Sequence, residues 1–121
     1  MAFLVKRIHE PADPADGYRV LVDRLWPRGV SKERAALDEW AKDAAPSTAL
    51  RQWFHRNSGA FTEFSLRYRA ELDANPEAVA ALRRCDSEHG TVTLLHGVRD
   101  TTDNHARVLA EYLSSYTELM S

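Results

Sequence analysis

Short, mainly apolar runs alternate along the chain with longer segments in which apolar residues recur every three or four positions. The runs at Phe3–Ile8, Arg19–Val22 and Thr91–His96 are bounded by turn-forming residues, a pattern typical of strands. Residues 20–22 are all apolar, whereas a strand with one solvated face would alternate, so we expect this strand to be covered on both faces. The sequence therefore predicts a small, mainly parallel sheet of at least three strands.

The periodic segments predict about four helices, each with apolar residues on one face. The first begins after Ser47 as its N-cap, and the third begins at Pro76 with Asn75 as its cap. The last helix is expected from about Asp103 to Tyr116. The residues expected to face inward are Leu50, Trp53 and Phe54 in the first helix, Phe61, Phe64, Tyr68 and Leu72 in the second, Val79, Leu82 and Cys85 in the third, and Val108, Leu109, Tyr112, Leu113 and Tyr116 in the last.

Two shorter segments complete the predicted organisation. Ser31 is expected to cap a single helical turn, and Trp40, which stands among charged residues, is expected in a loop or a short helix pinned by its ring. The 121 residues have the length of one ordinary domain and contain no internal repeat or low-complexity tract. We therefore predict a single α/β domain over residues 1–121, in a three-layer-like arrangement.

Composition narrows the possible functions. The chain has 16 lysines and arginines, 18 aspartates and glutamates, and a formal net charge of −2, which argues against a general polyanion binder but leaves a local basic patch open. The single cysteine, Cys85, excludes an internal disulfide and a multi-cysteine metal site, and we expect no metal or other cofactor. The sequence has neither a signal-peptide pattern nor a segment long enough to span a membrane, so we expect a cytoplasmic location.

The second strand ends in a polar cluster. Asp23 and Arg24 follow the apolar run, and Trp26, Arg28 and Lys32 come soon after it. Ligands of open α/β sheets bind outside the carboxyl ends of the strands, where these side chains are expected. Arg24 and Arg28 would clamp an anion, while Asp23 would bond to an arginine or to a loop amide. The alternative is structural, with an Asp–Arg pair that closes the loop onto the sheet.

A second polar cluster lies between the Thr91–His96 strand and the last helix. Free amides and the helix dipole make a helix start receptive to anions, and Arg99, Thr101 and Asn104 are candidate ligand-binding residues here. The alternative is again structural, because one of residues 101–103 is expected to cap the helix. The single glycine of this loop excludes a phosphate-binding loop and a dinucleotide fingerprint. If the two strands are parallel neighbours, both clusters face one cleft.

Histidines supply the candidate acid–base groups. The candidates are His55, His96 at the strand end and His105 near the helix start, whose side chains titrate near neutral pH. Asp23, Asp100 or Asp103 could orient the ring of His96 or His105. For each histidine, a structural hydrogen-bonding role is the alternative. No serine lies in a nucleophile elbow and no spacing matches a helical zinc motif, so the sequence leaves open whether the protein is an enzyme.

Several motifs together resemble a known family. The string Asp-Arg-Leu-Trp-Pro-Arg-Gly at Asp23–Gly29, Trp40, the Ala45–Ser47 segment and the pair Asn104-His105 are similar to the YeaO-like branch of domain-of-unknown-function family 488. The resemblance extends over nearly the whole chain. It implies a small bacterial α/β protein and supplies no established activity. It also implies that tyrosine often stands at the position of His96, which weakens a catalytic role for that residue.

Two classes of function are compatible with these residues. The first is binding of a small phosphorylated or nucleotide-like ligand at the carboxyl ends of the strands. The alternative is a nucleic-acid or protein interaction module without catalysis, in which Trp26, Trp40 and the same arginines form a surface, joined by Arg51, Arg56 and Arg67 if the partner is single-stranded nucleic acid. A third possibility is an accessory protein with no ligand. Convergence of these groups in a concave pocket favours the first class.

Overall fold

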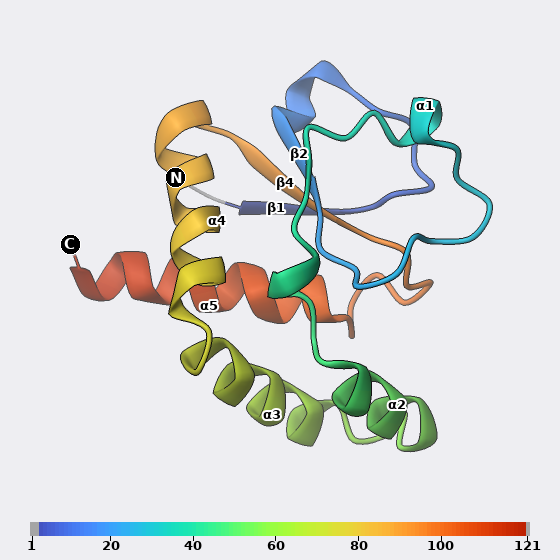
Figure 1. The fold of residues 1–121 in the computed structure, drawn as a ribbon, viewed down its shortest axis with the longest axis vertical. Coiled ribbons are helices and arrows are strands. Elements are labelled where there is room, and N and C mark those ends of the chain that lie inside the picture. The colour runs from blue at the N-terminus through green and yellow to red at the C-terminus, as the bar shows by residue number, and fades with distance from the viewer. Residues whose placement is uncertain (1–2, 121) are drawn as a thin grey trace.

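The computed structural model describes residues 3–120, with side chains placed for residues 3–114, so the side chain of Tyr116 lies outside the described residues. Figure 1 shows these elements as a ribbon. In chain order they are β1 (Phe3–Arg7), η1 (Pro14–Asp16), β2 (Tyr18–Leu21), α1 (Lys32–Ala35), β3 (Glu39–Trp40), η2 (Lys42–Ala44), α2 (Thr48–Arg56), α3 (Phe61–Asp73), α4 (Pro76–His89), β4 (Val92–His96) and α5 (His105–Met120). The predicted α/β class is confirmed. Over residues 3–120, no helix is both long and apolar enough to cross a membrane.

The four strands of the described region form one parallel sheet in the order β1-β4-β2-β3. Leu94 of β4 lies opposite Val5 of β1 on one side and opposite Val20 of β2 on the other. All five residues of β4 are buried. The predicted parallel pairing of the second and third apolar runs is therefore confirmed, and β4 lies between β1 and β2. Because all strands run the same way, the loops after β1, β2 and β4 leave the sheet at one edge.

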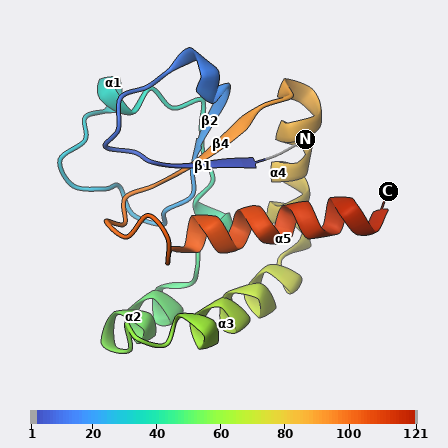
Figure 2. The same cartoon turned by 180° about the vertical axis from the view of Figure 1, so that it is seen from behind.

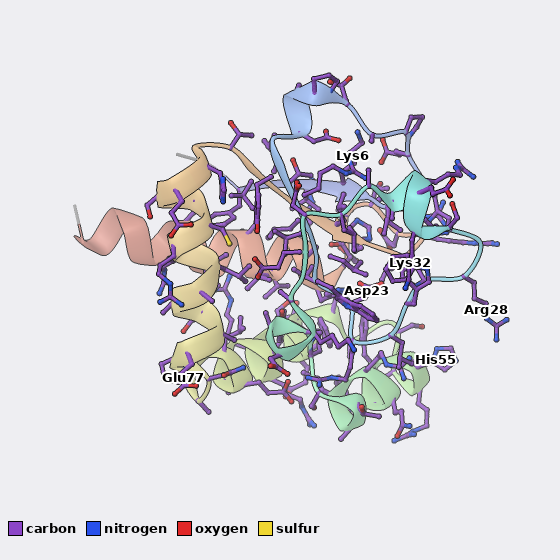
Figure 3. The ribbon with its side chains drawn as sticks, turned by 45° about the horizontal axis from the view of Figure 1, so that its top comes forward. Lys6, Asp23, Arg28, Lys32, His55 and Glu77 are labelled. Carbon is purple, nitrogen blue, oxygen red and sulfur yellow. The ribbon has the colours of Figure 1, made fainter. Side chains whose placement is uncertain are left out.

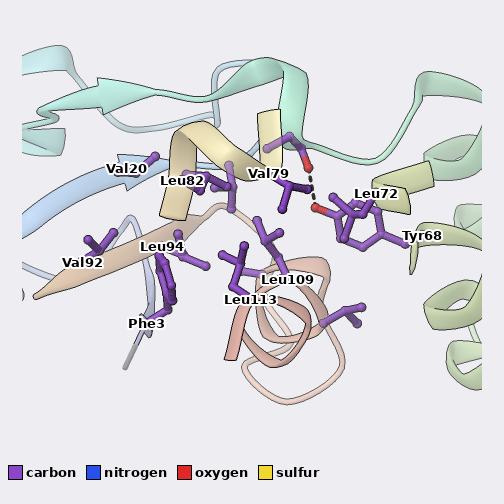
Figure 4. Packing of buried hydrophobic residues seen from close by; sticks show 14 of the residues in the cluster. Phe3, Val20, Tyr68, Leu72, Val79, Leu82, Val92, Leu94, Leu109 and Leu113 are labelled. Carbon is purple, nitrogen blue, oxygen red and sulfur yellow. Dashed lines mark hydrogen bonds between the residues drawn. The ribbon is translucent and has the colours of Figure 1, made fainter. Parts of the chain in front are cut away.

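Successive side chains of the central strands point to opposite faces, and both faces are covered. Val20 and Leu94 pack with the helices in the larger core, part of which is drawn in Figure 4. The smaller core, under the loops and α1, contains Ile8, Leu21, Val30, Ala35 and Leu95, with Trp26, Leu37 and Trp40 packed against it. Figure 2 shows α5 and the α2–α3 pair from the opposite side to Figure 1. Coverage of both faces explains the uninterrupted apolar run at residues 20–22 and gives the three-layer-like arrangement.

The starts of α1 and α2 follow the predicted capping signals, whereas the start of α4 differs in the role of Asn75. The side chains of Ser31 and Ser47 cap α1 and α2 as expected. Asn75 precedes α4, but its side chain does not cap that helix. Its amide instead donates to the backbone oxygen of Asp43 at 2.8 Å, which fastens the α3–α4 junction to η2.

Burial on the helices agrees with most of the predicted inward positions. The exceptions are Trp53, Phe54, Phe61 and Tyr112, which are only half-buried. The Arg67 guanidinium lies 4.2 Å from the centroid of the Trp53 ring. Cys85 is buried, and burial together with nearby Glu39 raises the pKa of its thiol to about 11. The thiol therefore stays protonated at neutral pH, in agreement with a packing role.

The short strand β3 replaces the loop or short helix predicted around Trp40. Amides on either side of it donate to the backbone oxygens of Arg19 and Leu21 in β2. A strand of two residues is too short to produce a recognisable pattern, which explains the wrong prediction. The pinning of Trp40 by its ring is confirmed, since Nε1 donates to the Asp23 backbone oxygen at 2.6 Å.

A buried carboxylate, that of Asp16, joins β1 and β2 to the segment between them. It accepts hydrogen bonds from Lys6 Nζ and Arg19 Nη1, and Arg19 also donates to the backbone oxygen of Ala35. Burial alone would raise the pKa of Asp16, but the bonds from the Asp13 amide, Lys6 and Arg19 outweigh burial and lower it. Arg19 and Asp16 are both buried, so each charge depends on the other for compensation.

We predict that Asp16→Asn lowers the free energy of unfolding by about 3 kcal/mol, because it leaves the Arg19 charge buried without its carboxylate. Urea unfolding at neutral pH measures this loss. Glu63→Gln is the control, since Glu63 pairs with Arg67 where both side chains are about half exposed, and its loss should cost less than about 0.5 kcal/mol. Equal losses in the two variants would contradict the role given to Asp16.

Candidate functional site

The loops after β2 and β4 are joined at the carboxyl edge of the sheet through Asp23. Its Oδ2 accepts a hydrogen bond from the Gly97 amide at 2.9 Å, which confirms the predicted bond to a loop amide. A Cβ atom on Gly97 would lie 2.8 Å from Pro27 Cβ and 3.0 Å from Asp23 Oδ2. Glycine is therefore required at position 97 for the two loops to approach this closely.

These loops form one wall of a cleft of about 1450 Å³, and α2 forms another. In Figure 3, Arg28 and His55 lie on the same side of the molecule, with Asp23 nearer its centre and Glu77 far from all three. The carboxylates among the described lining residues are Asp23 and Asp103. Six arginines line the same cleft: Arg7, Arg24, Arg28, Arg51, Arg56 and Arg99. The cleft is therefore strongly positive, although the chain has a net charge of −2.

Five of the seven predicted ligand-binding residues line this cleft, namely Arg24, Trp26, Arg28, Arg99 and Asn104. The other two, Lys32 on α1 and Thr101 in the loop after β4, are exposed and outside the lining. Both were predicted because they are close in sequence to the other site residues. After Gly29, however, the chain turns away from the cleft and places Lys32 outside it. The cleft thus unites the two polar clusters that the sequence places at the strand ends.

Arg24 holds the two walls of the cleft in position. Its Nη2 and Nε donate to the backbone oxygens of Ala45 and Pro46, both at 3.1 Å, just before α2 begins. The start of α2 is also bonded to α3, because the Glu71 carboxylate accepts from the Ser47 amide at 2.8 Å and from its hydroxyl. The Arg24 guanidinium therefore has a structural task in addition to its place in the cleft.

The side chain of Trp26 is also held by a hydrogen bond to a backbone oxygen, whereas the side chain of Arg28 is not. Trp26 Nε1 donates to the Val30 backbone oxygen at 2.7 Å, and its ring lies edge to face against Trp40 with centroids 5.4 Å apart. Arg28 is exposed, and the contact that fixes it is through its backbone oxygen, 2.9 Å from His9 Nε2. Its guanidinium is therefore available to a ligand.

Sequence reasoning missed Arg7 and His9, named His55 only as a candidate acid–base group, and connected Arg51 and Arg56 only with the nucleic-acid alternative. The three α2 residues stand on the polar side of an amphipathic helix, where exposure to solvent is the default expectation. No local pattern indicates that this side faces the sheet edge. That orientation depends on bonds from α3 and from the loop after β2, which are distant in sequence.

The start of α5 is organised by Asn104, so the predicted cap within residues 101–103 is wrong. Asn104 Oδ1 accepts from the Arg107 amide at 3.0 Å, and its Nδ2 donates to the Asp100 backbone oxygen at 2.9 Å. The side chain is 1% exposed. Asn104 therefore shapes the cleft wall, and its polar atoms are already used by the loop and the helix.

His105 lies between Asp23 and His96 at the base of the cleft. Its Nε2 is 2.9 Å from Asp23 Oδ1 and 3.1 Å from the Val22 backbone oxygen. Nε2 donates to the carbonyl, and Asp23 Oδ1 accepts no hydrogen bond from a described residue. The rings of His96 and His105 stand edge to face with centroids 6.3 Å apart. Because Nε2 is occupied, His105 suits a positioning role better than direct proton transfer to a ligand.

His96 is almost fully buried, at 1% exposure, and does not line the cleft. Burial, and then repulsion from His105, lowers the pKa of His96 to about 4, so its ring is neutral at pH 7. Ser58 is the only hydroxyl side chain among the described lining residues, and no hydrogen bond joins it to a described histidine. Across the part of the chain that the structure describes, no group of three or more histidines, cysteines, aspartates or glutamates could hold a metal ion. The chemical feature that distinguishes this cleft is therefore its arginine lining.

Comparison with known proteins identifies the family of this chain. A family model described as the inactive DUF488-N3 subclade matches residues 2–120. The chain belongs to this family. It is 46% identical over 110 residues to the uncharacterized protein YeaO of Escherichia coli K12, covering 91% of this chain and 95% of the relative. The uncharacterized proteins Mb3100c of Mycobacterium bovis and Rv3073c of Mycobacterium tuberculosis are each 43% identical, covering 91% of this chain and 92% of the relative. No solved structure matches the chain significantly. The resemblance to the YeaO-like branch is thus confirmed.

For this DUF488-N3 chain we predict that Gly97→Ala destabilises the fold by about 1–3 kcal/mol, because the added methyl group must push apart Pro27 and Asp23. Urea unfolding measures the change. Gly59→Ala is the matched control, since a Cβ there meets nothing within 4 Å. A Gly97→Ala protein as stable as this control would show that the loops are not closely joined.

We also predict that His96 makes stability depend on pH. The pKa of His96 is lower in the folded protein, about 4, than the ordinary 6.5. Its contribution is therefore complete above pH 6.5 and is lost as pH falls toward 4, by at most about 3 kcal/mol. Urea unfolding between pH 7.5 and 4.5 should give a shallower pH dependence for His96→Gln than for the wild type. An unchanged dependence would mean that His96 is not buried in its neutral form.

Proposed function

We propose that this protein binds a phosphorylated ligand in the arginine-lined cleft and does not convert it chemically. The observation that carries the proposal is the gathering of six arginines against two carboxylates around one cleft. A concave arrangement of these groups also favours ligand binding over contact through a convex surface.

Four exposed arginines of the cleft make no ion pair with a described residue, unlike the two arginines of α3. On α3, Arg67 and Arg69 pair with Glu63 and Glu111. In contrast, none of Arg28, Arg51, Arg56 and Arg99 forms an ion pair with a residue that the structure describes. Clustered, uncompensated positive charge raises the energy of the folded state, and a bound anion would relieve it. A ligand therefore explains a charge distribution that folding alone does not.

Phosphate groups fit the chemistry of this lining. The planar guanidinium fork donates two parallel hydrogen bonds to phosphate oxygens, and such charge-assisted bonds are stronger than neutral ones. Arg7 Nε is buried without a hydrogen-bond partner among the described residues, so it offers a further donor. The Asp23 carboxylate, which would repel an anion, is partly screened because it accepts from Gly97 and faces His105.

Several observations support binding without catalysis. The family to which the chain belongs is described as inactive. Nε2 of His105 is occupied by Val22 and Asp23, and His96 is buried and neutral. A general acid or base needs a proton-transfer atom within reach of the ligand, and neither Nε2 of His105 nor the ring of His96 provides one in this arrangement.

We predict that Arg28→Ala weakens binding of adenosine diphosphate and of pyrophosphate by about 1.5–3 kcal/mol, or roughly 10- to 150-fold in Kd. Arg28→Lys should recover only part of the affinity, because lysine keeps the charge but lacks the planar fork. Isothermal titration calorimetry measures the affinities, and thermal unfolding without ligand measures stability. Stability should change little, since Arg28 is exposed.

Arg34→Ala is the matched control, because Arg34 is an exposed arginine on α1 outside the cleft. It should leave both affinities within about threefold of the wild type. A marked fall in the melting temperature of Arg28→Ala in the absence of ligand would assign Arg28 to the fold instead. Failure of the wild type to bind either phosphate compound would overturn the proposed function.

A further inference from the structure

We propose that the ligand of the cleft is a short stretch of single-stranded nucleic acid, an inference that rests on the proposed function and names its ligand class. The first argument is size. The cleft of about 1450 Å³ exceeds the roughly 300–1,000 Å³ of pockets that hold small molecules. A ligand that fills it is larger than one phosphorylated metabolite, and a few linked nucleotides have the required size.

The second argument is the distribution of positive charge. Arg28 and Arg99 come from the loops at the strand ends, while Arg51 and Arg56 come from α2. One phosphate group is satisfied by one or two guanidinium forks. Four guanidinium groups on three segments therefore match a ligand with several phosphates in series, and a nucleic-acid backbone supplies such a series.

The third argument is the apolar surface among these arginines. Leu25 and Val98 line the cleft and are 61% and 37% exposed, and the half-buried rings of Trp26 and Phe54 line it too. The Phe54 ring is stacked on Phe64 with centroids 4.4 Å apart, which fixes its orientation. Unstacked bases can lie against such rings and against guanidinium planes, whereas the bases of a duplex are already stacked inside it. These groups therefore favour a single strand over a duplex.

An acidic peptide is the alternative macromolecule that arginines attract. Peptides that dock through their backbone need an open sheet edge. Here the edge strand β3 contributes no lining residue, and the edge strand β1 contributes only its last residue, Arg7. A peptide strand could therefore not add to the sheet from within the cleft, and the nucleic acid is the better match.

The test is fluorescence anisotropy with a labelled oligothymidylate of about 12 nucleotides and a labelled duplex of the same length. The wild type should bind the single strand at least about tenfold more tightly than the duplex. The double variant Arg51→Ala/Arg56→Ala should weaken binding of the single strand at least about tenfold. It should also reduce the slope of log Kd against log salt by about 1.4, or roughly 0.7 for each lost phosphate contact.

The matched control is Arg34→Ala/Arg84→Ala, which removes the same charge from two exposed arginines outside the cleft. It should change Kd by less than about threefold. Equal weakening by both double variants would overturn the inference, because attraction would then be spread over the whole surface. Binding of adenosine diphosphate with no tighter binding of the oligonucleotide, or equally tight binding of polyglutamate, would overturn this inference and leave phosphate binding intact. Absence of binding to all these probes would overturn both.

Discussion

The hydrogen bond from the Gly97 amide to the Asp23 carboxylate joins the loops after β2 and β4, which together form one wall of the cleft. Parallel pairing of β2 and β4 brings the loops to the same edge, but it does not fix their distance. Asp23 does so with its side chain, while Trp40 holds its backbone oxygen and His105 faces its other carboxylate oxygen. These contacts come from β3, from the residue after β4 and from α5, so the geometry of this edge depends on all three.

The arginines discussed above fall into two groups that differ in the bonds of their guanidinium groups. Arg19 and Arg24 donate to backbone oxygens and hold loops against the sheet, so their charges stabilise the fold. Arg28, Arg51 and Arg56 are exposed and make no such bonds with their guanidinium groups among the described residues. Mutual repulsion among like charges opposes folding, although solvent and salt reduce it. Arg19 and Arg24 are therefore needed for the fold, whereas the guanidinium groups of Arg28, Arg51 and Arg56 remain exposed at the cleft.

The sequence predicted those features that local patterns or general rules of α/β folds determine. The apolar run at residues 20–22 predicts a doubly covered strand, and parallel neighbours place both polar clusters at one edge. The bond of Asp23 to a loop amide follows from that edge. The cap of α5 could not be chosen correctly, because several consecutive polar residues before it can all accept from a helix amide. Nor could the place of Arg51 and Arg56 be foreseen, since the orientation of α2 depends on distant contacts with Glu71.

Anion binding and proton transfer require different groups in a cleft. Binding of an anion requires only complementary charge and donors that remain free, which exposed arginines on rigid walls provide. Proton transfer requires a titrating atom in reach of the ligand, but Nε2 of His105 is engaged and His96 is buried as a neutral ring. The arginines on α2 do not depend on either histidine, because Arg24 and Glu71 position that helix. The proposed anion binding by the α2 wall is therefore independent of the arrangement of the two histidines.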